Sequence, residues 1–195
     1  MSALRKRRQP LLEANRRNDL VRAAAFLFVS KGFMATTTRD IANAVGMRSG
    51  SPFYHFRSKQ ELLKTAIIEG LEAGCQRLQE AIAGIDDPEQ RLRKMMRAHL
   101  DHLFASDCQA PLLLYEVRWL EPSTRVEVAA LADRYQQPWQ TTLDELASLG
   151  RLPSSAPPLR LLLFGMLNWS SQWFRPDGDL SLDAIAEAAA DLLLA

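Results

Sequence analysis

A short polar segment after Gly46 carries side chains that can bind phosphate oxygens and the edges of bases. Its polar members are Ser49, Ser51, Tyr54 and His55. Phe53 and Phe56 are three residues apart, so they share one face of a short helix and can anchor that helix in a core. The polar side chains are then directed outward, where hydroxyl and imidazole groups can reach base edges and phosphate oxygens.

Lys59 follows at the start of the next helix, where a cation is out of place. Ser58 and Glu61 form a Ser-x-x-Glu capping box, which predicts a helix from about Lys59. The helix dipole disfavours positive charge at this end, so an anionic partner such as a phosphate would explain the lysine. A lysine that is only solvated is the alternative interpretation.

The residues before Gly46 predict a first helix that ends in a sharp turn. Thr37 is a good N-cap and Asp40, three residues later, can bond back to it, so a helix is expected from about Thr38. Gly46 supplies the permissive backbone for the turn. Together with a second short helix from Ser49, this pattern is that of a helix-turn-helix.

The segment resembles the DNA-binding domain of TetR-family repressors over about residues 16–65. The resemblance rests on Gly32-Phe33, Thr37-Thr38, Ile41-Ala42, Val45-Gly46, Gly50, Tyr54-His55-Phe56, Lys59 and Leu62. It implies base or groove contacts from Arg39, Ser49, Gly50 and Ser51, and phosphate contacts from Thr38, Tyr54, His55 and Lys59. Pro52 and Phe53 depart from the leucine and tyrosine that the family usually has, which removes one phenolic donor.

Charge is divided unevenly along the 195 residues. Residues 1–64 hold 13 Lys and Arg against 4 Asp and Glu, whereas the remainder holds 11 against 19. A basic head and an acidic body suit a protein that docks one end on a polyanion. No apolar run is long enough for a signal peptide or a membrane span, and the protein is therefore expected in the cytoplasm without a membrane partner.

Helical periodicity continues through the rest of the chain, so an all-α fold is expected. We expect a flexible basic arm at 1–15, a three-helix DNA-binding head at 16–64, and a larger helical ligand-binding and dimerisation body at 65–195. Helices outside the helix-turn-helix are predicted at about 16–31, 59–84, 88–105, 110–120, 123–149, 159–174 and 184–195. The segment at 110–120 is apolar enough to be a buried central helix.

The last two predicted helices are more apolar than the surface of a monomer. Leu161, Leu162 and Leu167 cover much of one helix, and Leu192 and Leu193 lie on the other. Pairing of two chains in a four-helix bundle is the natural use of such surfaces. TetR-like repressors pair in this way, and two heads on a two-fold axis can read a palindromic operator in double-stranded DNA.

The end of the penultimate helix resembles an acyl-CoA-responsive branch of TetR-like regulators. The resemblance rests on Asn168, Trp169, Trp173, Phe174, Arg175, Pro176 and Gly178. It favours an acyl-CoA thioester as a releasing effector, and a hydrophobic drug-like compound is the alternative. The predicted pocket residues are Met95, Met96, His99, Tyr115, Arg118, Trp119, Trp169, Trp173 and Arg175.

Other interpretations of the same residues remain open. His99 lies on an apolar stripe and is more readily a satisfied core histidine than a ligand contact. Trp169 and Trp173 are four residues apart, as an aromatic anchor in a core or interface would be. A non-specific architectural DNA-binding protein would share the basic head. Catalytic motifs and cofactor-binding motifs are not expected. A metal cluster is not expected either, because Cys75 and Cys108 are too isolated to form a metal site.

Overall fold

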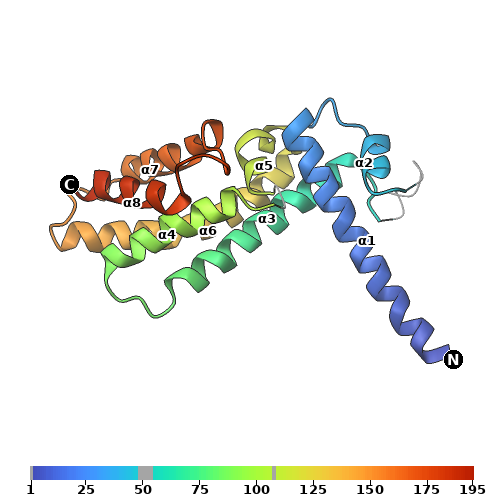
Figure 1. The fold of residues 1–195 in the computed structure, drawn as a ribbon, viewed down its shortest axis with the longest axis horizontal. Helices are drawn as coiled ribbons and strands as arrows, with labels where there is room; N and C mark the ends of the chain where they lie inside the picture. Colours follow the sequence, from blue (N-terminus) through green and yellow to red (C-terminus); the bar gives the residue numbers. More distant parts are fainter. Residues whose placement is uncertain (1, 48–54, 107–108) are drawn as a thin grey trace. The chain divides into compact units, whose positions relative to one another are not determined.

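The computed structural model describes the backbone of residues 2–47, 55–106 and 109–195 (Figure 1). Within these ranges it describes the side chains from residue 16 onward. Within these residues the secondary structure is helical, which confirms the all-α prediction. The helices are α1 (Ser2–Lys31), α2 (Thr38–Ala44), α3 (Lys59–Ile82), α4 (Pro88–Leu103), α5 (Ala110–Tyr115), α6 (Pro122–Ser148), α7 (Pro157–Trp169) and α8 (Leu182–Leu194), with 3₁₀ turns η2 (Val117–Trp119) and η3 (Ser170–Gln172).

The chain folds into two compact units. The first unit comprises residues up to Gly70 together with Ser106–Val128, and the second comprises Leu71–Ala105 and Ala129–Ala195. Helices α3 and α6 each begin in the first unit and end in the second. The first unit therefore includes α5, η2 and the start of α6 in addition to the predicted head, and a functional division at residue 64 stays a prediction.

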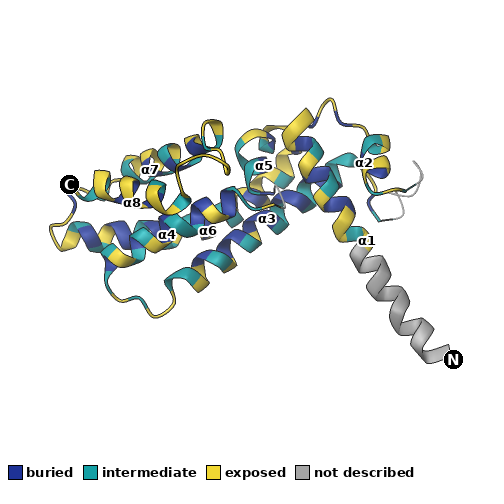
Figure 2. Ribbon diagram, in the orientation of Figure 1, coloured by how far each residue is buried: buried dark blue, intermediate teal, exposed yellow. Residues whose placement is uncertain are grey.

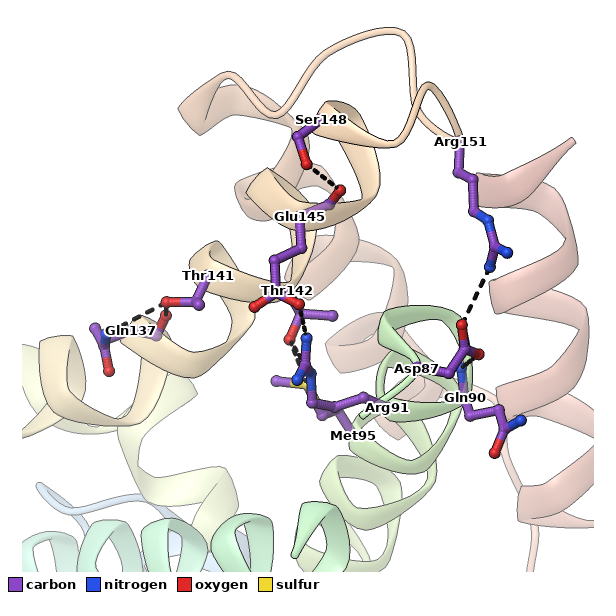
Figure 3. Close-up of polar contacts among 10 residues, drawn as sticks. All are labelled: Asp87, Gln90, Arg91, Met95, Gln137, Thr141, Thr142, Glu145, Ser148 and Arg151. Atoms are coloured by element: carbon purple, nitrogen blue, oxygen red, sulfur yellow. Dashed lines mark hydrogen bonds and ion pairs between the residues drawn. The ribbon is translucent and has the colours of Figure 1, made fainter. Parts of the chain in front are cut away.

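Local capping fixes where the helices begin. The Ser58 hydroxyl accepts the Glu61 N–H at 3.1 Å, while the Glu61 carboxylate accepts the Arg57 N–H at 2.6 Å, at the predicted start of α3. Asp87 accepts the Gln90 N–H at 2.9 Å and begins α4 directly before Pro88, as Figure 3 shows. These starts agree with the sequence predictions.

Helix α1 is longer than expected. It continues back to Ser2, where a flexible arm over residues 1–15 was predicted. The physical reason is composition: residues 3–9 read Ala-Leu-Arg-Lys-Arg-Arg-Gln, all strong helix formers. Pro10 lies within this helix and does not end it.

The core of the first unit forms where α1 meets α2 and α3. Buried positions recur along α1, where the ribbon is dark blue in Figure 2. They include Leu20, Ala24 and Phe28, which are four residues apart and fully buried. Ile41 of α2 and Leu63 of α3 are buried as well, with no exposed side-chain area. Apolar periodicity thus places the buried faces of α1, α2 and the start of α3.

The prediction of a buried helix at 110–120 is wrong. Helix α5 ends at Tyr115, and only Leu112 within it is buried. Tyr115 and Trp119 are 38% and 37% exposed. The reason is that α5 packs one side against α1, and Glu116 then turns inward to bond a distant backbone N–H, which breaks the helix into the η2 turn.

The core of the second unit is built around α4, which packs against α7 and α8. Leu92, Met96 and Leu100 of α4 and Trp139 of α6 are fully buried. Figure 3 shows Arg91 of α4 bonding residues of α6, including Thr142 at 3.1 Å. This packing buries the apolar stripe of α4.

Ion pairs reinforce the contact between α4 and α8. Arg93 pairs with Asp191 at 2.8 Å and with Glu187 at 2.5 Å, and these carboxylates raise the pKa of its guanidinium. Arg97 pairs with Asp183 at 2.7 Å. The partly exposed pairs hold α8 in register, although each adds little stability by itself.

Candidate nucleic-acid interface and helical body

Helix α2 is held at both ends by local hydrogen bonds. The Thr37 hydroxyl accepts the Asp40 N–H at 3.1 Å and the Asp40 carboxylate accepts the Thr37 N–H at 2.9 Å, which completes the predicted capping box. At the other end Gly46 has a φ of +67°, and the Met47 N–H donates to Ala42 O at 2.8 Å. The first helix and turn of the helix-turn-helix are therefore formed as predicted.

An exposed lysine supports the same cap. Lys31 Nζ lies 2.7 Å from Asp40 Oδ2, and this hydrogen bond, with those from Thr37, holds the pKa of Asp40 at about 2. The carboxylate is consequently charged at neutral pH, where it also complements the positive end of the α2 dipole.

Replacing Thr37 with alanine should lower the free energy of unfolding by about 1 kcal/mol, because the Asp40 N–H loses its acceptor. Thr38→Ala is the matched control, since Thr38 begins α2 without forming the cap. Its stability should stay within about 0.5 kcal/mol of the parent. Urea unfolding of both variants measures the difference, and equal losses would contradict the role given to Thr37.

The predicted DNA contacts are only partly within the described residues. Arg39 is exposed on α2, and Thr38 and His55 are half-buried at the surface of the same unit. Ser49, Gly50, Ser51 and Tyr54, together with Pro52 and Phe53, lie outside the described residues.

Lys59 is engaged within the first unit. Its Nζ donates to Phe33 O at 2.7 Å and to Thr36 O at 2.8 Å, and it lies 4.2 Å from the centre of the Phe33 ring. Desolvation lowers the pKa of this ammonium. These carbonyl oxygens account for a cation at the first position of α3. Two of the three N–H donors of Lys59 are engaged in this way, which leaves one N–H for the predicted phosphate contact.

In the second unit, His99 joins three helices through a buried polar chain. The Tyr135 hydroxyl of α6 donates to His99 Nδ1 at 2.9 Å, and His99 Nε2 donates to Asn168 Oδ1 of α7 at 3.0 Å, with the tautomer assigned from this network. Burial, opposed by the Asn168 bond, lowers the pKa of His99 to about 4. Burial with both ring nitrogens bonded is the arrangement expected of a satisfied core histidine. Sequence reasoning missed Tyr135, which carried no signal beyond its place on an apolar stripe.

The other predicted pocket residues have very different surroundings. Met95 and Met96 are fully buried in the second-unit core. Trp169 and Trp173 are 66% and 44% exposed, and Arg175 is exposed, so the tryptophans are not core anchors. Tyr115, Arg118 and Trp119 belong to the first unit, where the Arg118 guanidinium lies 5.3 Å from the Trp119 ring.

Each unit contains a cavity lined by described residues. The cavity of the first unit has a volume of about 520 Å³ and is lined by Asn18, Arg22, Glu69, Ser106 and Gln109. That of the second unit has a volume of about 760 Å³ and is lined by Glu89, Gly150, Arg151, Leu152, Pro153, Leu193, Leu194 and Ala195. Neither of these two is lined by the predicted ligand residues, whose role stays a prediction.

An apolar stripe on α7 is left without a partner in the described part of the chain. Leu161, Leu162 and Trp169 are 61%, 70% and 66% exposed, and Gly165 lies between them at helical spacing. Leu192 on α8 is 72% exposed. Exposed leucines and a tryptophan at this density are typical of a protein interface.

Membrane spans and metal clusters are both absent from the described residues. No helix there is long and apolar enough to cross a membrane. No group of three or more His, Cys, Asp or Glu side chains in that part of the chain has the arrangement of a metal site.

Comparison with known proteins matches both parts of the chain. Residues 20–66 match the family of bacterial regulatory proteins, tetR family, and residues 85–195 match the tetracyclin repressor-like C-terminal domain. The transcriptional repressor KstR2 of Mycolicibacterium smegmatis is 26% identical over 181 residues, covering 91% of this chain and 88% of KstR2.

Solved structures show the same fold. The TetR-family regulator PfmR from Thermus thermophilus superposes with a TM-score of 0.80 at 30% identity, covering 90% of this chain and 96% of PfmR. AibR in complex with isovaleryl coenzyme A and operator DNA gives a TM-score of 0.84 at 24% identity, covering 92% of this chain and 98% of AibR.

Proposed function

The chain belongs to the TetR family of bacterial regulatory proteins, and from this premise we propose that it is a dimeric repressor released from a palindromic operator by a small molecule. Family membership makes it a DNA-binding transcription regulator and not an enzyme. The proposal adds four points to family membership: the protein represses transcription, its operator is palindromic, a small molecule releases it, and it acts in the cytoplasm, where operator DNA lies.

The observation that carries the proposal is the capped helix α2 and its glycine turn on a basic unit. The Thr37–Asp40 capping box fixes one end of α2, and Gly46 directs the chain toward the polar segment 49–55. The excess of 13 basic over 4 acidic residues in positions 1–64 supplies the sequence-independent attraction to phosphates. Base contacts then supply the preference for one sequence.

We assign base or groove contacts to Arg39, Ser49, Gly50 and Ser51 and phosphate contacts to Thr38, Tyr54, His55 and Lys59. Arg39 is exposed on α2, as such a contact requires. Replacing it with alanine should change which bases are preferred, whereas Thr38→Ala should weaken binding about equally on all sequences.

The exposed stripe on α7 supports two-fold pairing through this helix. A palindrome needs two heads related by a two-fold axis, and the same helix face on both chains would then be in contact. Helices α3 and α6 run from the first unit into the second, so a change in the body can be carried to the head along continuous helices.

The effector proposed is an acyl-CoA thioester. The support is the resemblance of residues 168–178 to acyl-CoA-responsive regulators, together with the shared fold of AibR, whose complex holds isovaleryl coenzyme A. Met95, Met96, His99, Tyr115, Arg118, Trp119, Trp169, Trp173 and Arg175 are its proposed contacts. Calorimetry with a panel of CoA thioesters tests this, with a hydrophobic drug-like compound as the alternative; a panel that neither binds nor releases DNA excludes the thioester.

Selection from random double-stranded DNA tests the regulatory proposal. The protein should enrich a palindromic sequence, with affinity at least ~10³-fold above that for unrelated duplexes at physiological salt. An architectural protein would instead bind all duplexes alike with a strong salt dependence and no enriched sequence.

A further inference from the structure

The backbone of Phe33, in the turn between α1 and α2, is bonded by charged side chains at both its N–H and its carbonyl oxygen. The N–H of Phe33 donates to Glu116 Oε2 at 3.0 Å. The carbonyl oxygen of the same residue accepts from Lys59 Nζ at 2.7 Å. A carboxylate thus takes the donor and an ammonium takes the acceptor, which is the stronger, charge-assisted form of each hydrogen bond.

The turn that these bonds hold leads directly into the helix-turn-helix. Lys59 also bonds Thr36 O at 2.8 Å, directly before the Thr37 cap of α2. The Phe33 residue is 5% exposed, and its ring lies 5.2 Å from the ring of Phe28 on α1. Fixing Phe33 and Thr36 therefore fixes where α2 begins relative to α1.

Glu116 reaches this turn from a rigid support. It closes the C-terminal end of α5, which packs on α1, and its side chain is buried, with the residue 6% exposed. The residues that follow Glu116 are bonded to α3 at two points. Gln60 Nε2 donates to Trp119 O of η2 at 2.7 Å, and Lys64 pairs with Glu127 of α6 at 2.6 Å. All of these residues belong to the first unit.

Electrostatics alone would not place a buried carboxylate in a DNA-binding unit. A negative charge weakens the attraction of this basic surface for phosphates, and burial of a carboxylate is costly unless it is hydrogen-bonded. The bond to the Phe33 N–H is a reason for Glu116 to be there.

We propose that Glu116 is a positioning residue for operator binding: with Lys59 it clamps the Phe33–Thr36 turn and so sets the orientation of α2, the first helix of the helix-turn-helix. This inference rests on the proposed function and names a residue outside the helix-turn-helix that its specificity depends on. The clamp acts through backbone geometry, and Glu116 itself touches no DNA.

Glu116→Ala should weaken binding to the duplex selected from random DNA by about tenfold, since the buried Phe33 N–H loses its acceptor. Binding to a scrambled duplex should stay equal or become tighter, because one negative charge has been removed. The sign of the change in operator affinity discriminates between the two explanations, because loss of the negative charge alone would tighten binding to both duplexes. Glu121→Ala, which removes an exposed carboxylate from the same unit, is the matched control and should not weaken operator binding.

Glu116→Gln separates the hydrogen bond from the charge. The amide oxygen can accept the same N–H, so operator affinity should stay within about threefold of the parent. Combining Glu116→Ala with Lys59→Met should cost less than the sum of the two changes, because both act on one turn. Anisotropy titrations are made at a temperature where circular dichroism shows every variant folded.

The inference is overturned if Glu116→Ala binds the operator as the parent does, if the glutamine variant loses as much as the alanine variant, if the scrambled duplex is lost in parallel, or if the paired changes are additive. Failure of the parent protein to select any sequence would instead contradict the proposed function, so the two failures are distinguishable.

Discussion

Leu162→Glu should convert the dimer to a monomer and reduce operator affinity by roughly 100-fold or more, because a single head then loses the gain from binding two half-sites together. Leu162 is 70% exposed on the apolar stripe of α7. In an interface built around a two-fold axis the substitution acts on both chains, so each dimer would have to bury two additional carboxylates.

Sedimentation equilibrium measures this directly, because the monomer mass is 21.9 kDa. The parent should sediment at about twice that mass and the variant at about that mass. Val126→Glu is the control, since Val126 is 72% exposed but lies on α6 in the first unit. A Leu162→Glu protein that stays dimeric would exclude this face of α7 from the interface.

Acidification should destabilise the second unit through His99, and His99→Gln should remove that contribution. The folded-state pKa is lowered to about 4, whereas an unfolded histidine titrates near 6.5. The unfolded chain therefore binds the proton first, so the His99 contribution is fully present above pH 6.5 and is lost as the pH falls toward 4. At pH 5 the loss is about 2 kcal/mol.

Urea unfolding at pH 7.5 and pH 5, followed by tryptophan fluorescence, tests this. Trp139 lies 5.8 Å from the His99 ring and reports on its surroundings. The glutamine variant should be less stable at pH 7.5, because the Tyr135 and Asn168 bonds are disturbed, but should lose about 2 kcal/mol less on going to pH 5. A variant that falls as steeply as the parent would show that other groups carry the acid sensitivity.

Local chemistry made much of the fold predictable. Thr37 with Asp40, Ser58 with Glu61, and Asp87 before Pro88 are short-range partners, so the starts of α2, α3 and α4 could be read from spacing. The regular apolar stripe of α4 likewise predicted its buried face. The same reasoning predicted a buried helix at 110–120, and this prediction failed. Apolar composition does not reveal that only one side of α5 packs against another helix.

Long-range polar contacts could not be predicted. Glu116 and Phe33 are 83 residues apart, and Lys59 and Phe33 are 26 apart, so their sequence neighbours carry no sign of the bonds. Lys59 was correctly singled out as an unusual cation, but the partners that the structure gives it are carbonyl oxygens. For His99, the sequence carried no sign of Tyr135 and Asn168, which bond its two ring nitrogens in the structure.

Hydroxyl-radical footprinting of the dimer on its selected duplex tests the central claim most directly. The account predicts two equal protected patches, related by two-fold symmetry, with centres separated by about one helical turn of DNA or a multiple of it. A single patch, or uniform protection along the duplex without a preferred position, would contradict the assignment of this chain as a paired reader of a palindromic operator.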